Sequence, residues 1–187
     1  MDVRRDMSHT RTTPMRILIA EDELDIARTY RLSLEERGHK VVLTYDGEEC
    51  LIGYHDALER AKSEGDPIFS SHPFHAVVLD YRMPKIDGIE VAREILAVNP
   101  RQRIIFASAY VKETLEKSVK ELKQVVELMQ KPFGEQALID TIEDNQIYEE
   151  LRKLDVDVEA FKMVSPPHEY IQKLLEALRT LQKGRTF

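Results

Sequence analysis

Five side chains able to bind a metal ion or a phosphoryl group stand at or near the ends of short apolar runs in this 187-residue sequence. Carboxylates follow the first and third runs, a hydroxyl follows the fourth, and an amine follows the fifth: Glu21, Asp22, Asp80, Ser108 and Lys131. Mg²⁺ takes oxygen ligands and is usually held by one or two carboxylates together with phosphate oxygens and water. A single exposed acid most often only solvates a surface. The prediction of a magnesium site therefore depends on the whole set meeting in space.

The apolar runs alternate with segments of helical spacing, which indicates how the five side chains are positioned. Strands are expected at 17–20, 41–43, 76–79, 104–107 and 125–129, with a helix after each. Such alternation predicts a parallel sheet covered by helices on both faces. Functional sites of these sheets lie at the carboxyl ends of the strands. If the strand order is 2-1-3-4-5, the first and third strands are neighbours, and their three carboxylates crowd one edge where a cation would relieve their repulsion.

These motifs, taken in order, resemble the receiver domain of bacterial and archaeal two-component response regulators. The matching segments are Ile17–Glu23, Val77–Pro84 with Asp87-Gly88, Ser108-Ala109 and Lys131–Phe133. The resemblance covers residues 15–145 and implies an α/β, flavodoxin-like, doubly wound five-stranded parallel sheet of order 2-1-3-4-5. Residues 1–14 are then expected to be a flexible tail, and residues 146–187 a C-terminal helical extension.

The resemblance also implies a role for each site residue. Asp80 would accept a phosphoryl group from a sensor histidine kinase or a phosphotransfer protein. Lys131 would pair with a phosphoryl oxygen as a compact point charge, and the Ser108 hydroxyl would hydrogen-bond another. Mg²⁺ would be held by the side chains of Glu21, Asp22 and Asp80 and by the backbone carbonyl of Arg82. The Lys131–Pro132 bond is a candidate cis peptide, since X-Pro bonds have only a small trans preference.

Two features depart from the pattern of that family. Leu128 stands three residues before Lys131, where the family usually has an aromatic residue that turns inward on activation, and Tyr110 is a candidate replacement for it. The segment between the second and third strands is also long, with its surplus at 61–74, and we expect it to lengthen the second helix. Its role, like the kinase, the signal and the downstream target, does not follow from the sequence.

Composition limits the cellular compartment and the classes of partner expected for this protein. With one cysteine no internal disulfide can form, which suits a reducing cytoplasm. No apolar run is long enough to span a membrane, and the N-terminal segment lacks the apolar stretch of a signal peptide. A net charge of −7 disfavours general nucleic-acid binding, which needs clustered cations. We therefore expect a cytoplasmic protein with no membrane or nucleic-acid partner.

The segment 146–187 has an apolar stripe at helical spacing near its end. The stripe consists of Ile171, Leu174, Leu175, Leu178 and Leu181. A lone helix of this length is marginal in water, so the stripe must be buried, and homodimerisation or docking to a partner is the preferred role. We expect no DNA-binding output domain, because a Pro-Pro break at 166–167 replaces the tight turn of a helix-turn-helix.

The favoured function is therefore a phosphoacceptor switch that takes part in its own phosphorylation and dephosphorylation, not an enzyme that turns over a small substrate. One alternative is a haloacid-dehalogenase-like phosphatase, but that class needs a second Asp two residues after the nucleophile, where Arg82 stands. Another is a DNA-binding transcriptional regulator that uses the basic residues near the C-terminus: Arg179, Lys183 and Arg185.

Overall fold

The protein is described from a computed structural model, which covers residues 13–64, 72–109, 122, 127–154, 156 and 168–183. The chain divides into two compact units, Met1–Pro132 and Phe133–Phe187. Each unit is described by itself. Within the described ranges, no helix is both long enough and apolar enough to cross a membrane.

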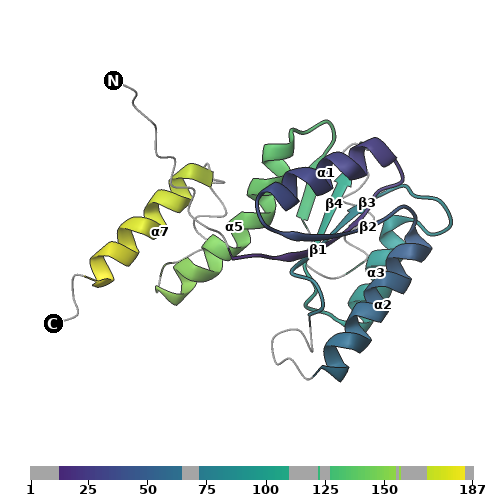
Figure 1. The fold of residues 1–187 in the computed structure, drawn as a ribbon, viewed down its shortest axis with the longest axis horizontal. Coiled ribbons are helices and arrows are strands. Elements are labelled where there is room, and N and C mark those ends of the chain that lie inside the picture. The colour runs from purple at the N-terminus through teal and green to yellow at the C-terminus, as the bar shows by residue number, and fades with distance from the viewer. Residues whose placement is uncertain are drawn as a thin grey trace. The chain divides into compact units, whose positions relative to one another are not determined.

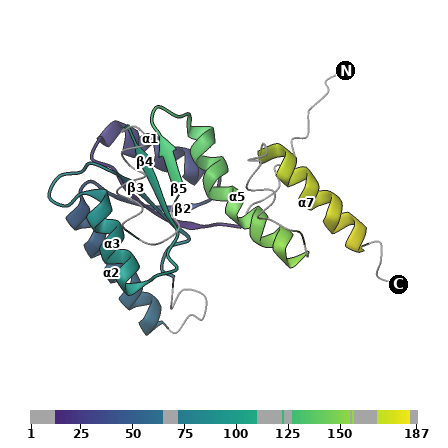
Figure 2. The same cartoon turned by 180° about the vertical axis from the view of Figure 1, so that it is seen from behind.

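The first unit is a parallel five-stranded sheet with helices on both faces, as the sequence predicts (Figures 1 and 2). Its strand order is β2-β1-β3-β4-β5, which confirms the expected order. The strands are β1 (Arg16–Ala20), β2 (Lys40–Thr44), β3 (Ala76–Asp80), β4 (Ile104–Ser108) and β5 (Glu127–Gln130). Among the described residues of this unit, the helices are α1 (Leu24–Glu36), α2 (Gly47–Ser63) and α3 (Gly88–Val98). Helices α2 and α3 lie together on one face and α1 lies on the other (Figure 1).

Strands β1, β3 and β4 form the buried centre of the sheet, because apolar residues cover both of their faces. Ile104 and Phe106 are fully buried, and β3 is buried up to Leu79. The register pairs Ala20 with Leu79 and Asp80 with Ala107. The residues that follow β1, β3 and β4 therefore emerge side by side at one edge of the sheet.

Helix α2 begins with a reciprocal cap. The Asp46 carboxylate accepts a hydrogen bond from the Glu49 backbone N–H at 2.8 Å, and the Glu49 carboxylate accepts one from the Tyr45 N–H at 2.9 Å. This pairing satisfies two backbone donors at the start of the helix. The helix continues to Ser63, and residues 65–71 of the surplus segment lie outside the described residues.

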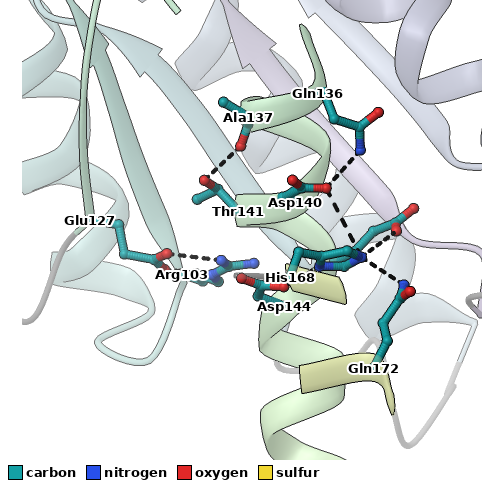
Figure 3. Close-up of polar contacts among 10 residues, drawn as sticks. Arg103, Glu127, Gln136, Ala137, Asp140, Thr141, Asp144, His168 and Gln172 are labelled. Carbon is teal, nitrogen blue, oxygen red and sulfur yellow. Dashed lines mark hydrogen bonds and ion pairs between the residues drawn. The ribbon is translucent and has the colours of Figure 1, made fainter. Parts of the chain in front are cut away.

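Several expectations fall on parts of the chain outside the described residues. Of the helix expected after β4, at 113–122, only Leu122 is described, and it is buried. Tyr110 lies outside the described residues. Strand β5 is described from Glu127. It pairs in parallel with β4. The Arg103 guanidinium also donates from Nε and Nη2 to the carboxylate of Glu127, the first described residue of β5, at 2.6 and 2.9 Å (Figure 3).

In the described part of the second unit, two helices share a small apolar core. Helix α5 (Glu135–Lys153) and helix α7 (His168–Lys183) bury five side chains between them: Ile147, Tyr148, Leu151, Ile171 and Leu175. The predicted apolar stripe of the C-terminal segment therefore lies on α7. At Ile171 and Leu175 it is covered by α5 of the same chain.

His168, the first residue of α7, lies among carboxylates of α5 (Figure 3). Its Nδ1 hydrogen-bonds the Asp144 carboxylate, and its Nε2 lies 3.9 Å from Glu143 Oε2 and 4.0 Å from Asp140 Oδ1. The Gln172 amide, one turn along α7, lies 2.6 Å from Nε2. The hydrogen bond that His168 donates to Asp144 and the three negative charges raise the pKa of His168, against the effect of its burial.

This cluster predicts that the pairing of α5 and α7 weakens as the pH rises. A raised folded pKa means that His168 protonation stabilises the pair fully below about pH 6.5, its ordinary value, and that this contribution is lost above the folded pKa. We expect Asp144→Asn to lower the His168 pKa in an NMR titration. It should also cost about 1 kcal/mol of unfolding free energy at acidic pH and less at alkaline pH. Glu149→Gln, at an exposed position of α5, is the control. An unchanged His168 pKa in Asp144→Asn would contradict the prediction.

Candidate functional site

The amine of Lys131 joins two carboxylates that are distant in the sequence. Lys131 Nζ lies 2.7 Å from Glu21 Oε2 and 3.1 Å from Asp80 Oδ2. Glu21 follows β1, Asp80 ends β3, and Lys131 follows β5, so all three stand at the carboxyl edge of the sheet. The side chains of Lys131 and Asp80 are 11% and 13% exposed, and Glu21 is fully buried. The predicted convergence of these three residues is confirmed.

Asp22 completes a set of three carboxylates at this edge. One carboxylate oxygen from each of Glu21, Asp22 and Asp80 lies within 4.8 Å of the others. Asp22 is exposed, whereas Glu21 Oε1 is buried and has no hydrogen-bond partner. A buried carboxylate oxygen without a donor is costly, and a bound cation would satisfy it. The donor set therefore fits a hard divalent ion such as Mg²⁺.

Burial and mutual charge shape the electrostatics of the pocket. Burial raises the pKa of Glu21 to about 7, although the hydrogen bond and positive charge of Lys131 oppose that shift. Burial alone would lower the pKa of the Lys131 amine, but its hydrogen bond and charge contact with Glu21, together with Asp80, raise it above the ordinary value. Lys131 therefore stays protonated and carries a positive charge beside Asp80.

Ser108 and the turn after β5 belong to the same edge. Ser108 is the last residue of β4, is fully buried, and follows Ala107, which pairs with Asp80. Its backbone carbonyl accepts a hydrogen bond from the Lys131 N–H at 2.8 Å. The Lys131–Pro132 peptide is cis, as predicted. A backbone hydrogen bond therefore joins Ser108 to Lys131, whose amine contacts Asp80.

The loop after Asp80 folds back onto the strand that precedes it. The Arg82 backbone N–H lies 3.4 Å from Asp80 Oδ1, and the Gly88 N–H donates to the Tyr81 carbonyl at 3.0 Å. A Cβ atom at Gly88 would lie 2.1 Å from the Asp80 carbonyl oxygen, so a side chain cannot be accommodated there without a shift of the backbone. The Arg82 guanidinium lies over the Tyr81 ring, 5.8 Å from its centre. Arg82, the predicted carbonyl ligand, is therefore held close to Asp80.

One part of this region is missed by sequence reasoning. Lys85, in the loop after β3, forms ion pairs with Asp46 and Glu48 at the start of α2. In the sequence, Asp46-Gly47 indicates only a turn, and Lys85 has no signal that distinguishes it from a solvated surface lysine. Its partners can be identified only from the folded sheet, where β2, β1 and β3 are neighbours and the loops that follow β2 and β3 meet.

The strand order defines a doubly wound α/β fold of the CheY-like kind. The three carboxylates place its site at the carboxyl ends of the strands. Comparison with protein families gives the same answer. The family described as response regulator receiver domain matches residues 17–143, and the chain belongs to this family.

Individual relatives agree with this assignment. The response regulator receiver protein CpdR of Brucella abortus is 30% identical over 128 residues, which are 68% of this chain and 93% of that protein. The response regulator MprA of Mycolicibacterium vanbaalenii is 34% identical over 96 residues, which are 51% of this chain but only 35% of MprA. The chain therefore spans about a third of the length of MprA. Among solved structures, the CheX–CheY–BeF3–Mg²⁺ complex of Borrelia burgdorferi contains a chain 25% identical with a TM-score of 0.55, covering 67% of this chain and 84% of that one.

Proposed function

We propose that this receiver domain is a phosphoacceptor switch that takes a phosphoryl group on Asp80 from a histidine kinase or a phosphotransfer protein. The observation that carries the proposal is the position of Lys131 Nζ, which contacts both Asp80 and Glu21 in a pocket with three convergent carboxylates. Incubation with acetyl phosphate and magnesium, followed by intact-mass measurement, tests it. One added phosphoryl group supports the proposal, and an unchanged mass contradicts it.

The chemistry that fits this pocket is transfer of a phosphoryl group to a carboxylate. An oxygen of Asp80 forms a bond to phosphorus while the bond from phosphorus to the donor's imidazole nitrogen breaks, and the electron pair of that bond returns to the imidazole. Lys131, already 3.1 Å from Asp80 Oδ2, is placed to pair with a phosphoryl oxygen as negative charge arrives. Ser108, from the end of β4, is proposed to hydrogen-bond another phosphoryl oxygen and so to report that the site is occupied.

Magnesium is the expected cofactor of this reaction. It would be held by the side chains of Glu21, Asp22 and Asp80 and by the backbone carbonyl of Arg82. When bound, Mg²⁺ would neutralise negative charge on the phosphoryl oxygens during in-line transfer to Asp80. The buried Glu21 Oε1, which has no hydrogen-bond partner, supports this assignment.

We propose that the protein acts as a signalling domain and does not turn over small substrates. The aspartyl phosphate is an acyl phosphate and therefore labile, so the signal is erased by hydrolysis at the same site. The phosphatase alternative is disfavoured, because Arg82 stands where that class needs a second Asp. The family assignment likewise does not favour the alternative of a DNA-binding regulator.

The output is proposed to be a change in protein contacts in the cytoplasm, with the segment 146–187 serving homodimerisation or partner docking. Helix α5 covers part of the apolar stripe of α7, so a docking partner would have to use the rest of that segment or replace α5. Light scattering after size exclusion, with and without phosphorylation, tests for a dimer. A monomer under both conditions would leave docking to another protein as the proposed role.

A further inference from the structure

Lys85 connects the loop that carries Arg82 to the start of helix α2 by two ion pairs. Lys85 Nζ lies 2.8 Å from Asp46 Oδ2 and 2.9 Å from Glu48 Oε2. Asp46 is nearly buried and already serves as the cap of α2, so it offers the lysine a fixed anchor. The contacts of Lys85 raise its own pKa and lower that of Asp46, so both groups are charged when they meet.

The same anchor is connected to the acidic pocket from the other side. The Thr44 carbonyl, two residues before Asp46, accepts a hydrogen bond from the Glu21 N–H at 3.1 Å. The Thr44 hydroxyl in turn donates to the Ile19 carbonyl at 3.1 Å. The Glu21–Asp22 turn and the loop after Asp80 are therefore linked through the segment 44–48, and Lys85 closes this link.

The backbone at Lys85 is strained, and a hydrogen bond from the Ile86 N–H to the Pro84 carbonyl at 2.8 Å closes the turn around it. Lys85 has φ of 66°, a left-handed conformation that costs a residue with a side chain free energy. Its neighbour Ile86 packs against Gly47 so closely that a Cβ atom on Gly47 would lie 2.1 Å from the Ile86 carbonyl oxygen. The ion pairs with Asp46 and Glu48 join this turn to the start of α2.

We propose that Lys85 is a positioning residue for the metal site: by binding Asp46 and Glu48, it holds the loop that presents the Arg82 carbonyl beside Glu21 and Asp22. This inference rests on the proposed function, because it concerns the magnesium that the pocket takes. It predicts that loss of Lys85 weakens Mg²⁺ binding before any phosphoryl donor is present.

The sign of the effect separates positioning from simple electrostatics. Lys85 is a cation near a cation site, so removing its charge would by itself strengthen Mg²⁺ binding. Positioning predicts the opposite, because a loosened loop must be ordered again when the ion binds. Exposed ion pairs have modest effects, so we expect Mg²⁺ binding to weaken by about threefold to fivefold.

The first experiment measures the Mg²⁺ dissociation constant by isothermal titration calorimetry on the full-length protein. Lys85→Met is expected to raise it, and Lys85→Arg, which keeps the charge, is expected to stay near the wild type. Lys62→Met is the matched control, because Lys62 is equally exposed and pairs with Glu59 within α2. Unchanged or tighter binding in Lys85→Met would overturn the proposal, and so would equal weakening in Lys62→Met.

A double-mutant cycle tests the partner directly. Asp46→Asn removes the charge that binds Lys85, while asparagine keeps the helix cap. If Lys85 acts partly through Asp46, Lys85→Met weakens Mg²⁺ binding less in the Asp46→Asn background than in the wild type, because only the pair with Glu48 remains to be lost. Full additivity would overturn the mechanism. Hydrogen exchange of the amides at 81–88 should speed up in both single variants. The wild type reports separately on the proposed function, since failure to bind Mg²⁺ or to gain a phosphoryl group there contradicts that function and not the role of Lys85 alone.

Discussion

Asp80→Asn is expected to abolish the gain of a phosphoryl group from acetyl phosphate in magnesium buffer. The asparagine amide is nearly the same size as the carboxylate but lacks the nucleophilic anion, so the pocket keeps its shape and loses its acceptor. Intact-mass measurement reads the result directly, because the wild type carries one added phosphoryl group and the variant none. We expect at least a roughly 100-fold fall in the rate.

The control for this variant is the same substitution elsewhere in the same loop. Asp87→Asn changes a carboxylate that caps α3 by accepting from the Glu90 N–H at 2.9 Å, and asparagine caps helices as well as aspartate does. It should therefore be phosphorylated at close to the wild-type rate. A phosphoryl group that persists in Asp80→Asn would show that another residue is the acceptor, and peptide mapping would then identify it.

The site is largely predictable from the sequence, because position after a strand determines position at the edge of a parallel sheet. Glu21, Asp80 and Lys131 are separated by 51 to 110 residues along the chain, but they follow β1, β3 and β5, whose carboxyl ends share one edge. Short apolar runs are enough to locate these strands. The order of the sheet then brings Asp80 next to the Glu21–Asp22 turn.

Burial and side-chain partners are harder to predict than position. Glu21 is buried by parts of the chain distant in sequence, and its raised pKa follows mainly from that burial. The contacts of Lys85 depend on a left-handed backbone at one loop residue, which nothing in the local sequence demands. Sequence reasoning therefore finds the groups that do the chemistry more readily than those that position them.

In the C-terminal segment, too, the helix is predictable from the sequence but its packing partner is not. The apolar stripe predicts a helix and predicts that the helix must be buried, and both hold for α7 at Ile171 and Leu175. It does not identify α5 as the covering surface, because an apolar stripe packs against any apolar face of similar shape. The polar contact of His168 with Asp144 adds selectivity, but it joins residues 24 positions apart and has no local sequence pattern.

Lys131→Met is expected to separate the two properties of the pocket, by slowing phosphorylation about 100-fold while leaving Mg²⁺ binding intact or stronger. The amine is the positive charge that meets the arriving phosphoryl group, so its loss raises the barrier to transfer. The same amine repels a metal cation from the three carboxylates, so its loss favours the metal. Calorimetry and the rate of mass gain measure the two effects, and Lys62→Met serves as the surface control. Weakened Mg²⁺ binding with unchanged phosphorylation would contradict the assigned role of Lys131.

The stability of the same variant tests whether Glu21 is the group that Lys131 neutralises. Without the amine, ionised Glu21 is a buried charge lacking its partner, which destabilises the fold by about 3–5 kcal/mol in urea unfolding. The pKa of Glu21, already raised to about 7, would rise further. In the unfolded chain the Glu21 carboxyl ionises at lower pH than in the folded protein. The loss of stability is therefore largest above the folded pKa and fades as the pH falls toward about 4.5, the ordinary pKa of the group.

Adding Glu21→Gln to Lys131→Met should restore stability at alkaline pH without restoring phosphorylation, because the buried charge is gone and the cation that meets the phosphoryl group is still missing. Recovery of both properties would instead mean that Lys131 acts on transfer only by neutralising Glu21.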